Sequence, residues 1–405
     1  MAVTAPVAGY ARSFDARLAA VLPGVAARSP ELAGRLRAAG MRPEELTSAA
    51  AVARLPVLTK DELVELQARD PPFGGLLREG ARPRRVFQSP GPLYEPEPDA
   101  ADPWRWAPAL RAAGFGPGQV VLNAFGYHLS PAGAMFEEGA RAVGCTVVPA
   151  GVGGADLQVA ACLDLGVSGY VGLPSWLKAL LEKLEERAPE APPLQRAFVT
   201  AEPLPDELRA WLRRRVPTVR QGYGTAETGN LGYECEAEAG WHVPDDALVE
   251  VCDEDGRPLG PGERGEVVAT LLRDDYPLVR FGTGDLSSWV GGPCSCGRAT
   301  PRLAGWQGRT GAAVKVRGMF LHPRQVRAVM ADVRGVAGYR FVVGREADRD
   351  TLRCELALAP EGDAGAAVAD ARERIRSGLR FNAAVEVVDA VAGDGPVVVD
   401  ERAAP

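Results

Sequence analysis

The chain has 405 residues, of which 46% are hydrophobic and 24% are charged, and its formal net charge is −7. This is the composition of an ordinary globular protein, and the length allows a large domain and a smaller one. A net negative charge without a strongly basic stretch argues against a nucleic-acid-binding surface. Arginine carries nearly all of the positive charge, because the 46 basic residues include four lysines: Lys60, Lys178, Lys183 and Lys315.

The seven cysteines are unevenly spaced, which is typical of a protein from a reducing compartment. The N-terminal segment MAVTAPVAGYARSF has no basic region followed by an apolar stretch, and no uninterrupted apolar run reaches the length of a membrane span. The sequence therefore predicts a cytoplasmic protein without a membrane partner.

Residues 14–70 carry apolar side chains at three- and four-residue spacing, which predicts helices. Breaks are expected at Pro23, Pro30 and Pro43. The stretch 71–103 is rich in proline and glycine, so it is predicted to form loops.

From about residue 119 the pattern alternates between short apolar strands and helices, which predicts a parallel sheet covered by helices and an α/β fold class. Residues 247–290 are β-rich segments joined by glycine and proline turns. After Gly308 the chain restarts as a compact α+β unit of the usual domain size. The predicted domains are therefore 1–308 and 309–405.

Between Gln221 and Arg317 the chain presents five polar, glycine-rich segments in order: GYGTAE, GERGEVVAT, LVRFGTGDL, CSCGR and GRTGAAVKVRG. Glycines let a backbone approach a ligand closely, and single polar side chains beside them can hold it. No one segment is specific, but their order indicates a ligand site.

Four residues in this region form a candidate metal set: Cys235, His242, Cys294 and Cys296. Their pattern is C-x6-H followed by C-x-C, and these ligand types fit a closed tetrahedral structural zinc. The alternative is unligated cysteines in glycine turns, because C-x-C is a weaker signal than C-x-x-C. The remaining cysteines lie among apolar residues and are predicted to be core thiols.

The five segments, together with four others, resemble the phenylacetate-CoA ligase branch of the adenylate-forming (AMP-binding) enzymes. The additional segments are LPVLTKDEL at 55–63, GYHLSPAGAMFEEGARAVGCTVVPAG at 126–151, GLPSW at 172–176 and AEPL at 201–204. The resemblance covers most of the chain and implies an adenylate-forming fold. In that fold, a large N-terminal α/β domain with a β-rich subdomain binds AMP and the acyl group, and a small C-terminal α+β domain is mobile.

The same resemblance implies an activity. Such enzymes use ATP to convert an aryl or other carboxylic acid to an acyl-adenylate, from which CoA displaces AMP to form a thioester. The implied cofactors are ATP or AMP, CoA and Mg²⁺, and the implied partners are a small-molecule carboxylic acid and a nucleotide. A homodimer is compatible with the sequence, and no nucleic acid is expected as a partner.

Within GYGTAE, Tyr223 resembles the ring that stacks on adenine, and Gly224 and Thr225 would face the α-phosphate. Glu227 resembles the carboxylate that holds Mg²⁺. The alternative interpretation of this segment is a tight turn with a buried tyrosine.

Asp285 resembles the aspartate that accepts both ribose hydroxyls, and Arg309 resembles the arginine that reaches the ribose or a phosphate. Their alternatives are a turn or cap aspartate and a surface salt bridge. Ala201 and Glu202 match the family's adenine-binding loop, where the backbone is expected to act.

The phosphate loop departs from the family pattern. Segment 87–96 contains no lysine, and its Pro90 and Pro92 lack the backbone N–H donors that cradle phosphates. Ser89 and Gly91 remain, so a rearranged loop is the alternative to a lost one. Three acids in or after the segment are expected to repel polyphosphate: Glu95, Glu97 and Asp99.

The C-terminal tail is the second departure. The family's adenylation lysine bridges the substrate carboxylate and the α-phosphate, yet no lysine follows Lys315 in this chain. Asp394 or a neighbour stands near its position, and an acid there reverses the electrostatics. Arg380 and Arg402 are candidate replacements, and Lys315 is the candidate for assisting the thioester step.

Phe125, Tyr127 and His128 match the wall of the family's acyl pocket, where aromatic residues and glycines shape an apolar slot. His128 would orient a carboxylate or act as a base; alternatively it is a hydrogen-bonded packing residue.

Two hypotheses of function follow from these residues. The first is a phenylacetate-CoA ligase-like enzyme. The second is a catalytically degenerate homologue that binds an AMP-type or acyl ligand without adenylation, as a regulator or within a complex. The absent lysine and the proline-containing loop favour the second hypothesis, whereas the adenosine-facing residues favour retained binding of AMP.

Overall fold

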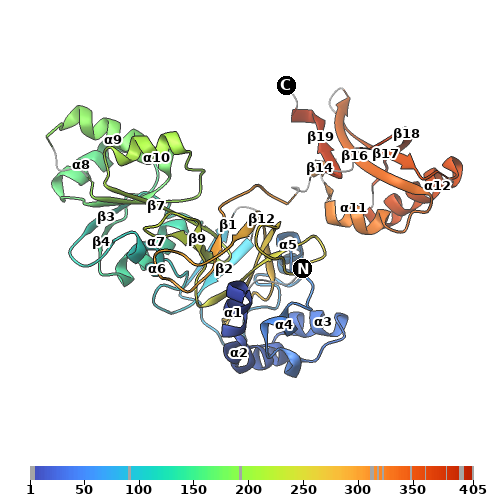
Figure 1. Ribbon diagram of the computed structural model, residues 1–405, viewed down its shortest axis with the longest axis horizontal. Helices are drawn as coiled ribbons and strands as arrows, with labels where there is room; N and C mark the ends of the chain where they lie inside the picture. The colour runs from blue at the N-terminus through green and yellow to red at the C-terminus, as the bar shows by residue number, and fades with distance from the viewer. Residues whose placement is uncertain are drawn as a thin grey trace. The chain divides into compact units, whose positions relative to one another are not determined.

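The structure is a computed structural model that describes residues 5–89, 93–190, 194–310, 314–316, 319–321, 323–346, 349–360, 362–379, 381–391 and 396–403 (Figure 1). The chain divides into two compact units, Met1–Gly308 and Arg309–Pro405. None of the described helices has the length and apolarity that crossing a bilayer requires.

The N-terminal segment is helical, as its apolar spacing predicts. Ser29 caps α3 by accepting a hydrogen bond from the backbone N–H of Leu32 at 3.3 Å, and Pro30 occupies the first turn. The break predicted at Pro23 is wrong: α2 continues through it, because its apolar face, with Leu18, packs into the core. The helices are α1 (Ala5–Ser13), α2 (Asp15–Arg28), α3 (Pro30–Ala38), α4 (Ala49–Val52) and α5 (Lys60–Arg69), with a 3₁₀ turn η1 (Pro43–Glu45).

A hairpin interrupts the stretch that was expected to form loops. Its strands β1 (Arg85–Ser89) and β2 (Leu93–Glu97) pair antiparallel, and Arg85 lies opposite Glu97. The Arg85 guanidinium donates to the fully buried Glu97 carboxylate, with one contact of 2.8 Å. Local composition does not reveal such a cross-strand ion pair, which explains why the loop prediction is wrong here.

Eleven strands of the described residues form one sheet in the order β10-β11-β12-β13-β9-β8-β7-β6-β5-β3-β4. Strands β3 to β7 pair in parallel, as the alternating pattern predicts, and helices cover both faces (Figure 1). Trp106 and Phe136 pack on one face, whereas Tyr170, Leu177 and Leu180 pack on the other. The elements are β3 (Val120–Asn123), β4 (Thr146–Val148), β5 (Gly169–Gly172), β6 (Arg196–Val199), β7 (Thr218–Thr225), α6 (Ala107–Ala112), α7 (Ala132–Ala142), α8 (Ala155–Asp164), α9 (Pro174–Arg187) and α10 (Asp206–Arg213).

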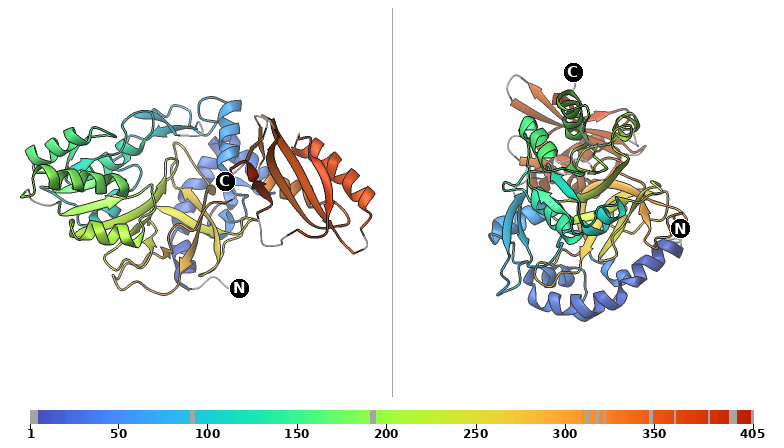
Figure 2. Two further views of the ribbon diagram at one scale, coloured as in Figure 1. Left: turned by 90° about the horizontal axis from the view of Figure 1, so that it is seen from above. Right: turned by 90° about the vertical axis from the view of Figure 1, so that its left-hand side faces the viewer.

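Strand β7 is where the sheet changes from parallel to antiparallel, because it pairs in parallel with β6 and antiparallel with β8. Helices α1, α2 and α3 share a hydrophobic core with the antiparallel half of the sheet (Figure 2). The antiparallel strands are β8 (Gly229–Glu234), β9 (Trp241–His242), β10 (Ala247–Cys252), β11 (Arg264–Leu271), β12 (Phe281–Val290) and β13 (Arg302–Leu303).

The second unit is an α+β structure with a four-stranded sheet in the order β18-β17-β16-β19. The buried side chains of Met330, Phe341 and Leu356 form part of its separate core. Its elements are β14 (Val314–Val316), β15 (Met319–Leu321), α11 (Pro323–Met330), β16 (Val336–Glu346), β17 (Arg349–Leu358), α12 (Ala364–Arg374), a π-helical turn η2 (Ile375–Leu379), β18 (Ala384–Val388), β19 (Val398–Asp400) and a 3₁₀ turn η3 (Glu401–Ala403).

One charged side chain lies deep inside the first unit. Arg280 is 1% exposed, and its guanidinium donates to the Glu250 carboxylate at 3.1 and 3.3 Å. The same guanidinium donates to the carbonyls of Ala53 and Leu55, just before α5. The Leu58 N–H donates to the Arg280 carbonyl at 2.8 Å. Arg280 therefore joins the start of α5 to β10 and β12.

Replacing Arg280 by Met should lower the free energy of unfolding of the first unit by about 3–5 kcal/mol, because Glu250 would remain buried without its partner. All seven tryptophans lie within Met1–Gly308, so tryptophan fluorescence in urea follows this unit.

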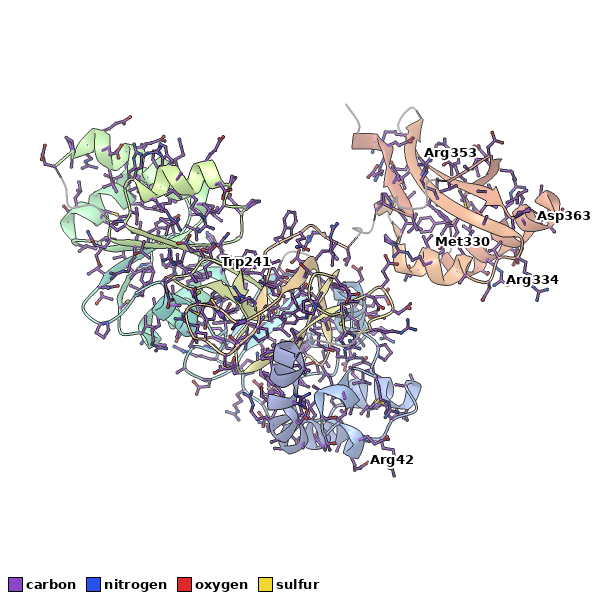
Figure 3. All side chains as sticks on the ribbon, in the orientation of Figure 1. Arg42, Trp241, Met330, Arg334, Arg353 and Asp363 are labelled. Atoms are coloured by element: carbon purple, nitrogen blue, oxygen red, sulfur yellow. The ribbon has the colours of Figure 1, made fainter. Side chains whose placement is uncertain are left out.

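The matched control is Arg42→Met, because the Arg42 side chain is 79% exposed (Figure 3). This change should alter the free energy of unfolding by less than about 0.5 kcal/mol. Equal losses in the two variants would contradict the role of Arg280.

Candidate functional site

Predicted site residues from three segments lie at the carboxyl edge of the parallel strands. Tyr127 follows β3, Glu202 follows β6, and residues 223–225 end β7. The hydroxyl of Thr200 donates to the carbonyl of Gly222 at 2.7 Å, which joins the ends of β6 and β7. Open α/β sheets bind ligands outside the carboxyl ends of their strands, near points where the strand order reverses. Here the order reverses at β3, which lies between β4 and β5.

Tyr223 and Asp285, which are 62 residues apart in sequence, are brought into contact. The Tyr223 hydroxyl is 3.1 Å from Asp285 Oδ2 and 3.1 Å from Thr283 Oγ1. The Tyr223 ring is buried and stacks on Trp241 with ring centroids 5.6 Å apart. The structure thus unites the predicted adenine and ribose residues, although one face of the Tyr223 ring is already covered by Trp241.

Asp285 has a second partner that the sequence did not indicate. Its Oδ1 accepts a hydrogen bond from Trp306 Nε1 at 3.2 Å, and the Asp285 N–H donates to Thr283 Oγ1 at 3.1 Å. Asp285 is 8% exposed, and the Trp306 and Tyr223 donors beside its carboxylate compensate for its removal from water. Trp306 precedes the GRTG segment, but a lone tryptophan offers no sequence signal for such a contact.

Glu227, the predicted metal ligand, is paired with a lysine. Lys60 Nζ lies 2.6 Å from Glu227 Oε1, and the Glu227 side chain is 4% exposed. Lys60 begins α5, which Thr59 caps by accepting from the Glu62 N–H at 3.2 Å. The sequence places Lys60 in a segment that resembles the family, but no role was predicted for it. The small number of lysines in the chain is the sequence feature that could have singled it out.

Glu95 approaches the same pair from β2. Burial, reinforced by the negative charge of Glu227, raises the pKa of Glu95 to about 8. The Oε1 atom of Glu95 has no hydrogen-bond partner among the described residues. The raised pKa favours the neutral form of Glu95, and Arg85 forms an ion pair with Glu97. Both effects reduce the negative charge that these two acids present, and their repulsion of polyphosphate stays a prediction.

The predicted phosphate loop also contains Ser89 and Gly91. Ser89 is buried at the end of β1, whereas Gly91, with Pro90 and Pro92, lies outside the described residues. The phosphate contacts of this loop therefore stay a prediction.

Gly224 and Thr225 shape the turn that carries Glu227. A Cβ on Gly224 would lie 2.2 Å from the carbonyl oxygen of Gly229, so the close pairing of β7 and β8 requires glycine there. Thr225 Oγ1 accepts a hydrogen bond from the Thr228 N–H at 3.2 Å. The Thr225 hydroxyl thus stabilises the turn.

The predicted acyl-pocket residues lie between β3 and α7. The Phe125 ring is buried and stacks on Phe136, with ring centroids 4.7 Å apart. The Tyr127 hydroxyl accepts from Asn123 Nδ2 at 2.7 Å. His128 is exposed, and the described residues include no hydrogen-bond partner for it. The interpretation of His128 as a packing residue is therefore wrong.

In the loop after β6, Ala201 has a left-handed backbone, with φ of 67°. The Glu202 carboxylate accepts from the Ser175 hydroxyl at 2.6 Å, near the start of α9. Because the Glu202 side chain is bound to Ser175, the loop would contact a ligand through its backbone groups.

The four candidate metal ligands converge. Their ligand atoms lie within 4.8 Å of one another: Cys235, His242, Cys294 and Cys296. The Sγ atoms of Cys235 and Cys294 are 3.6 Å apart, which is too long for a disulfide, and Cys296 Sγ lies 3.3 Å from His242 Nε2. His242 Nδ1 lies 3.0 Å from the carbonyl of Thr300. If Nδ1 carries the proton, this contact orients Nε2 as the ligand.

The cluster cross-links three chain segments. Cys235 follows β8, His242 lies on β9, and Cys294 and Cys296 lie between β12 and β13. The predicted convergence of these residues is thus present, although the ion itself remains a proposal.

Three of the predicted site residues belong to the second unit. Arg309 belongs to this unit, and Lys315 lies in β14 opposite Phe320. Arg402 forms ion pairs with Asp350 and Asp400, each at 2.8 Å, so its charge is largely neutralised. The other two tail positions singled out, Arg380 and Asp394, lie outside the described residues.

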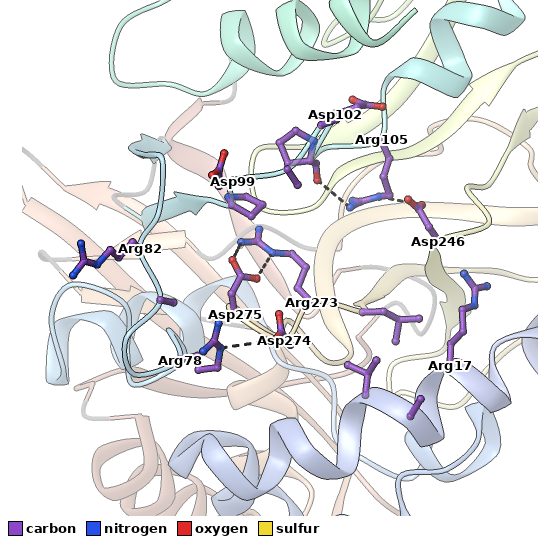
Figure 4. Close-up of a pocket in the computed structure, with 18 residues that line it drawn as sticks. Arg17, Arg78, Arg82, Asp99, Asp102, Arg105, Asp246, Arg273, Asp274 and Asp275 are labelled. Carbon is purple, nitrogen blue, oxygen red and sulfur yellow. Dashed lines mark hydrogen bonds and ion pairs between the residues drawn. The ribbon is translucent and has the colours of Figure 1, made fainter.

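A separate cavity of about 720 Å³ lies between α2 and the segments near residues 78–82, 98–105 and 272–275 (Figure 4). Arg273 pairs with Asp275 at 2.8 Å, and Arg105 pairs with Asp246 at 3.5 Å. Five arginines and five aspartates line this cavity, so it carries no excess charge that would select a ligand.

Comparisons with known proteins agree with this geometry. A family profile described as AMP-binding enzyme matches residues 109–270, which include strands β3 to β10 and nearly all of β11. A solved 2-hydroxyisobutyryl-CoA ligase, in complex with R3-HIB-AMP, is similar with a TM-score of 0.70 and 25% identity, over 99% of this chain and 91% of that chain. The chain therefore has the fold of the adenylate-forming enzymes.

Two phenylacetate-coenzyme A ligases are similar to this chain in sequence. Phenylacetate-coenzyme A ligase of Thermus thermophilus is 35% identical over 260 residues, which cover 62% of this chain and 58% of that relative. The corresponding ligase of Aromatoleum evansii is 29% identical over 345 residues, or 81% of this chain and 77% of that relative. Over most of its length the chain is therefore similar to phenylacetate-CoA ligases.

Replacing Glu95 by Gln should reduce the loss of stability at alkaline pH. The unfolded carboxyl ionises near its ordinary pKa of 4.5, whereas the folded one keeps its proton up to about pH 8. Between these values the folded state binds more protons, so stability falls as pH rises through the window and levels off above it. Glu95→Gln keeps a neutral side chain, so its melting temperature should fall less between about pH 5 and 9.

Glu44→Gln is the control, because Glu44 is exposed on η1. This variant should retain the pH dependence of the wild-type protein. The assignment to Glu95 fails if both variants lose stability with pH to the same extent as the wild type.

Proposed function

We propose that the protein is a phenylacetate-CoA ligase-like enzyme that activates an aryl or other carboxylic acid with ATP, through an acyl-adenylate, to a CoA thioester. The contact between Tyr223 and Asp285 at the carboxyl edge of the sheet carries this proposal. The relatives are named phenylacetate-CoA ligases, and the similar 2-hydroxyisobutyryl-CoA ligase was solved with 2-HIB-AMP and CoA.

Each residue group has a role in this proposal. Asp285 receives the ribose hydroxyls, and Tyr223, fixed by Trp241 and Asp285, borders the adenine. Phe125 and Tyr127 wall the acyl slot beside them. Arg309 and Lys315 keep the roles in nucleotide contact and the thioester step that the family resemblance implies.

We assign the positive charge near the phosphates to Lys60. Of the lysines in the first unit, Lys178 and Lys183 pair with Glu182 and Asp156 on α9 and α8. Lys60 alone contacts a predicted site residue, Glu227. Its ammonium would stabilise charge that develops on the α-phosphate, the role that the resemblance gives to a lysine of the tail.

Glu227 fits Mg²⁺ as a hard oxygen ligand, and the ion would supply charge neutralisation for the phosphates. Lys60 already neutralises this carboxylate at 2.6 Å. Mg²⁺ would therefore compete with Lys60 for the Glu227 carboxylate.

The alternative function is a catalytically degenerate homologue that binds an AMP-type or acyl ligand. The absence of lysine after Lys315 and the pairing of Arg402 with two aspartates favour it. A cytoplasmic location and a homodimer stay predictions from the sequence under either function.

The two functions differ in turnover. Purified protein with ATP, CoA and a panel of aryl and fatty acids should release pyrophosphate and AMP if it is a ligase. Asp285→Asn should lower kcat/KM about 10- to 100-fold, because hydrogen bonds to a charged group contribute about 1.5–3 kcal/mol.

Asp274→Asn is the matched control, because this aspartate is 66% exposed, and its kcat/KM should match the wild type. No turnover with any acid, while AMP still raises the melting temperature, would favour the binding homologue instead.

We also propose that Cys235, His242, Cys294 and Cys296 hold a structural Zn²⁺. With Zn–S bonds of about 2.3 Å, neighbouring ligand atoms of a tetrahedral site lie about 3.8 Å apart. The separations of 3.6 Å and 3.3 Å are close to that value. Such an ion would tie β8 and β9 to the segment between β12 and β13, and so stabilise the strand that carries Asp285.

Metal analysis tests this site directly. Wild-type protein should hold about one zinc per chain, and the double variant Cys294→Ser and Cys296→Ser should hold none. Chelation should lower the melting temperature of the wild type but not of the double variant.

Cys162→Ala, which changes a core cysteine on α8 outside the cluster, should retain zinc. Metal-free wild-type protein expressed with added zinc would rule the proposal out.

A further inference from the structure

Arg105 is a buried charge beside the turn that carries Glu227. Its side chain is 9% exposed, and its guanidinium donates a hydrogen bond to the backbone carbonyl of Thr228. Its Nε lies 3.5 Å from Oδ1 of Asp246, whose side chain is 53% exposed (Figure 4). The guanidinium thus joins a carboxylate at the surface to the residue that follows Glu227.

The backbone around Arg105 also binds this part of the chain. The carbonyl of Trp104 accepts a hydrogen bond from the N–H of Asn230, and the carbonyl of Arg105 accepts one from Asn230 Nδ2, each at 2.9 Å. A Cβ on Gly229 would lie 2.5 Å from the Trp104 carbonyl oxygen, so the two segments are in direct contact. Trp104 and Arg105 therefore hold the turn 225–229 at the point where β8 begins.

The backbone of Arg105 is left-handed, with φ of 63°. This conformation is costly for a residue with a Cβ, and it persists where the surrounding contacts fix it. The hydrogen bonds to Thr228 and Asn230 and the ion pair with Asp246 are such contacts. Backbone strain of this kind is concentrated at functional sites, and Glu227 is the nearest predicted site residue in the turn that Arg105 binds.

Two cations hold Glu227, one through its side chain and one through the backbone. Lys60 Nζ contacts the Glu227 carboxylate at 2.6 Å, whereas Arg105 binds the carbonyl of the next residue. A displacement of the turn would carry the carboxylate with it. A misplacement of about 1 Å in a site can cost about 100-fold in rate, so the position of this backbone matters for the chemistry.

We propose that Arg105 is a positioning residue, which fixes the Glu227 carboxylate against Lys60 by holding the backbone of the turn 225–229. Asp246 supplies the counter-charge for the buried guanidinium. The catalytic consequence of this role rests on the proposed function, in which Glu227 and Lys60 lie near the phosphates. Arg105 itself needs no contact with the nucleotide or the acid.

The first test measures the coupling of Lys60 with Glu227 in the free energy of unfolding. A double-mutant cycle of Lys60→Met and Glu227→Gln gives this coupling from urea titrations followed by tryptophan fluorescence. The cycle is repeated in Arg105→Gly, which removes the guanidinium and suits the left-handed backbone. The coupling should fall to less than about half of its value in the wild-type background, because the turn can then move away from Lys60.

Arg82→Gly is the matched control, because Arg82 lines the same cavity as Arg105 but is exposed (Figure 4). The coupling of Lys60 with Glu227 in this background should equal that of the wild type. If Arg105→Gly does not fold, Arg105→Lys takes its place with the same expectation. Lysine keeps the charge but lacks the planar fork of donors that reaches two partners.

The second test measures catalysis with an acid that the wild type activates. Arg105→Gly should lower kcat/KM about 10- to 100-fold, and adding Glu227→Gln should lower it little further, because both changes affect the same carboxylate. Ethylguanidinium can enter the cavity that Arg105 lines, so it should restore part of the activity of Arg105→Gly but none of that of Glu227→Gln. Arg82→Gly should keep the kcat/KM of the wild type.

The role of Arg105 is overturned if the coupling of Lys60 with Glu227 is absent in the wild type or unchanged in the Arg105 variant. Fully additive losses of kcat/KM would also overturn it, since Arg105 would then act independently of Glu227. A failure of the proposed function gives a different result: the coupling falls in the Arg105 variant, yet the wild type activates no acid. In that case Arg105 positions Glu227, and only the ligase activity is lost.

Discussion

The buried guanidinium of Arg280 is the constraint on which the rest of the first unit depends. It neutralises Glu250 and donates hydrogen bonds to the carbonyls of Ala53 and Leu55, so helical and β segments that are far apart in sequence are joined. Through the pairing with Leu58, α5 starts beside β12. Two groups of the proposed site, Lys60 on α5 and Asp285 on β12, therefore lie on elements that meet at Arg280. A buried charge is tolerated there because the guanidinium donates to the Glu250 carboxylate, to backbone carbonyls and to the Cys252 sulfur.

The site has two halves with different electrostatics. In the proposed adenosine half, the Asp285 carboxylate lies beside donors from Tyr223 and Trp306. In the proposed phosphate half, Lys60 pairs with Glu227, and burial raises the pKa of Glu95, which favours its neutral form. Burial of Glu95 and the ion pair of Glu227 thus reduce the negative charge that these acids would present to a nucleotide.

Much of the architecture follows from local patterns. The parallel strands, their covering helices and the α+β unit after Gly308 correspond to the alternation of apolar segments, because burial of one face dictates that spacing. Predictions from local sequence fail where contacts with residues elsewhere in the chain determine the structure. Pro23 remains inside a helix because of the core beneath it, and the β1–β2 hairpin depends on the pairing of Arg85 with Glu97.

The sequence by itself determined the family resemblance, the order of the site segments and the absence of a lysine after Lys315. It also contained the four ligands whose side chains converge, because their types are visible in the chain. Only the tertiary structure decided that Lys60 pairs with Glu227, that burial raises the pKa of Glu95 and that Trp306 donates a hydrogen bond to Asp285. These properties depend on distance and on exclusion of water, and folding sets both between residues that are remote in sequence.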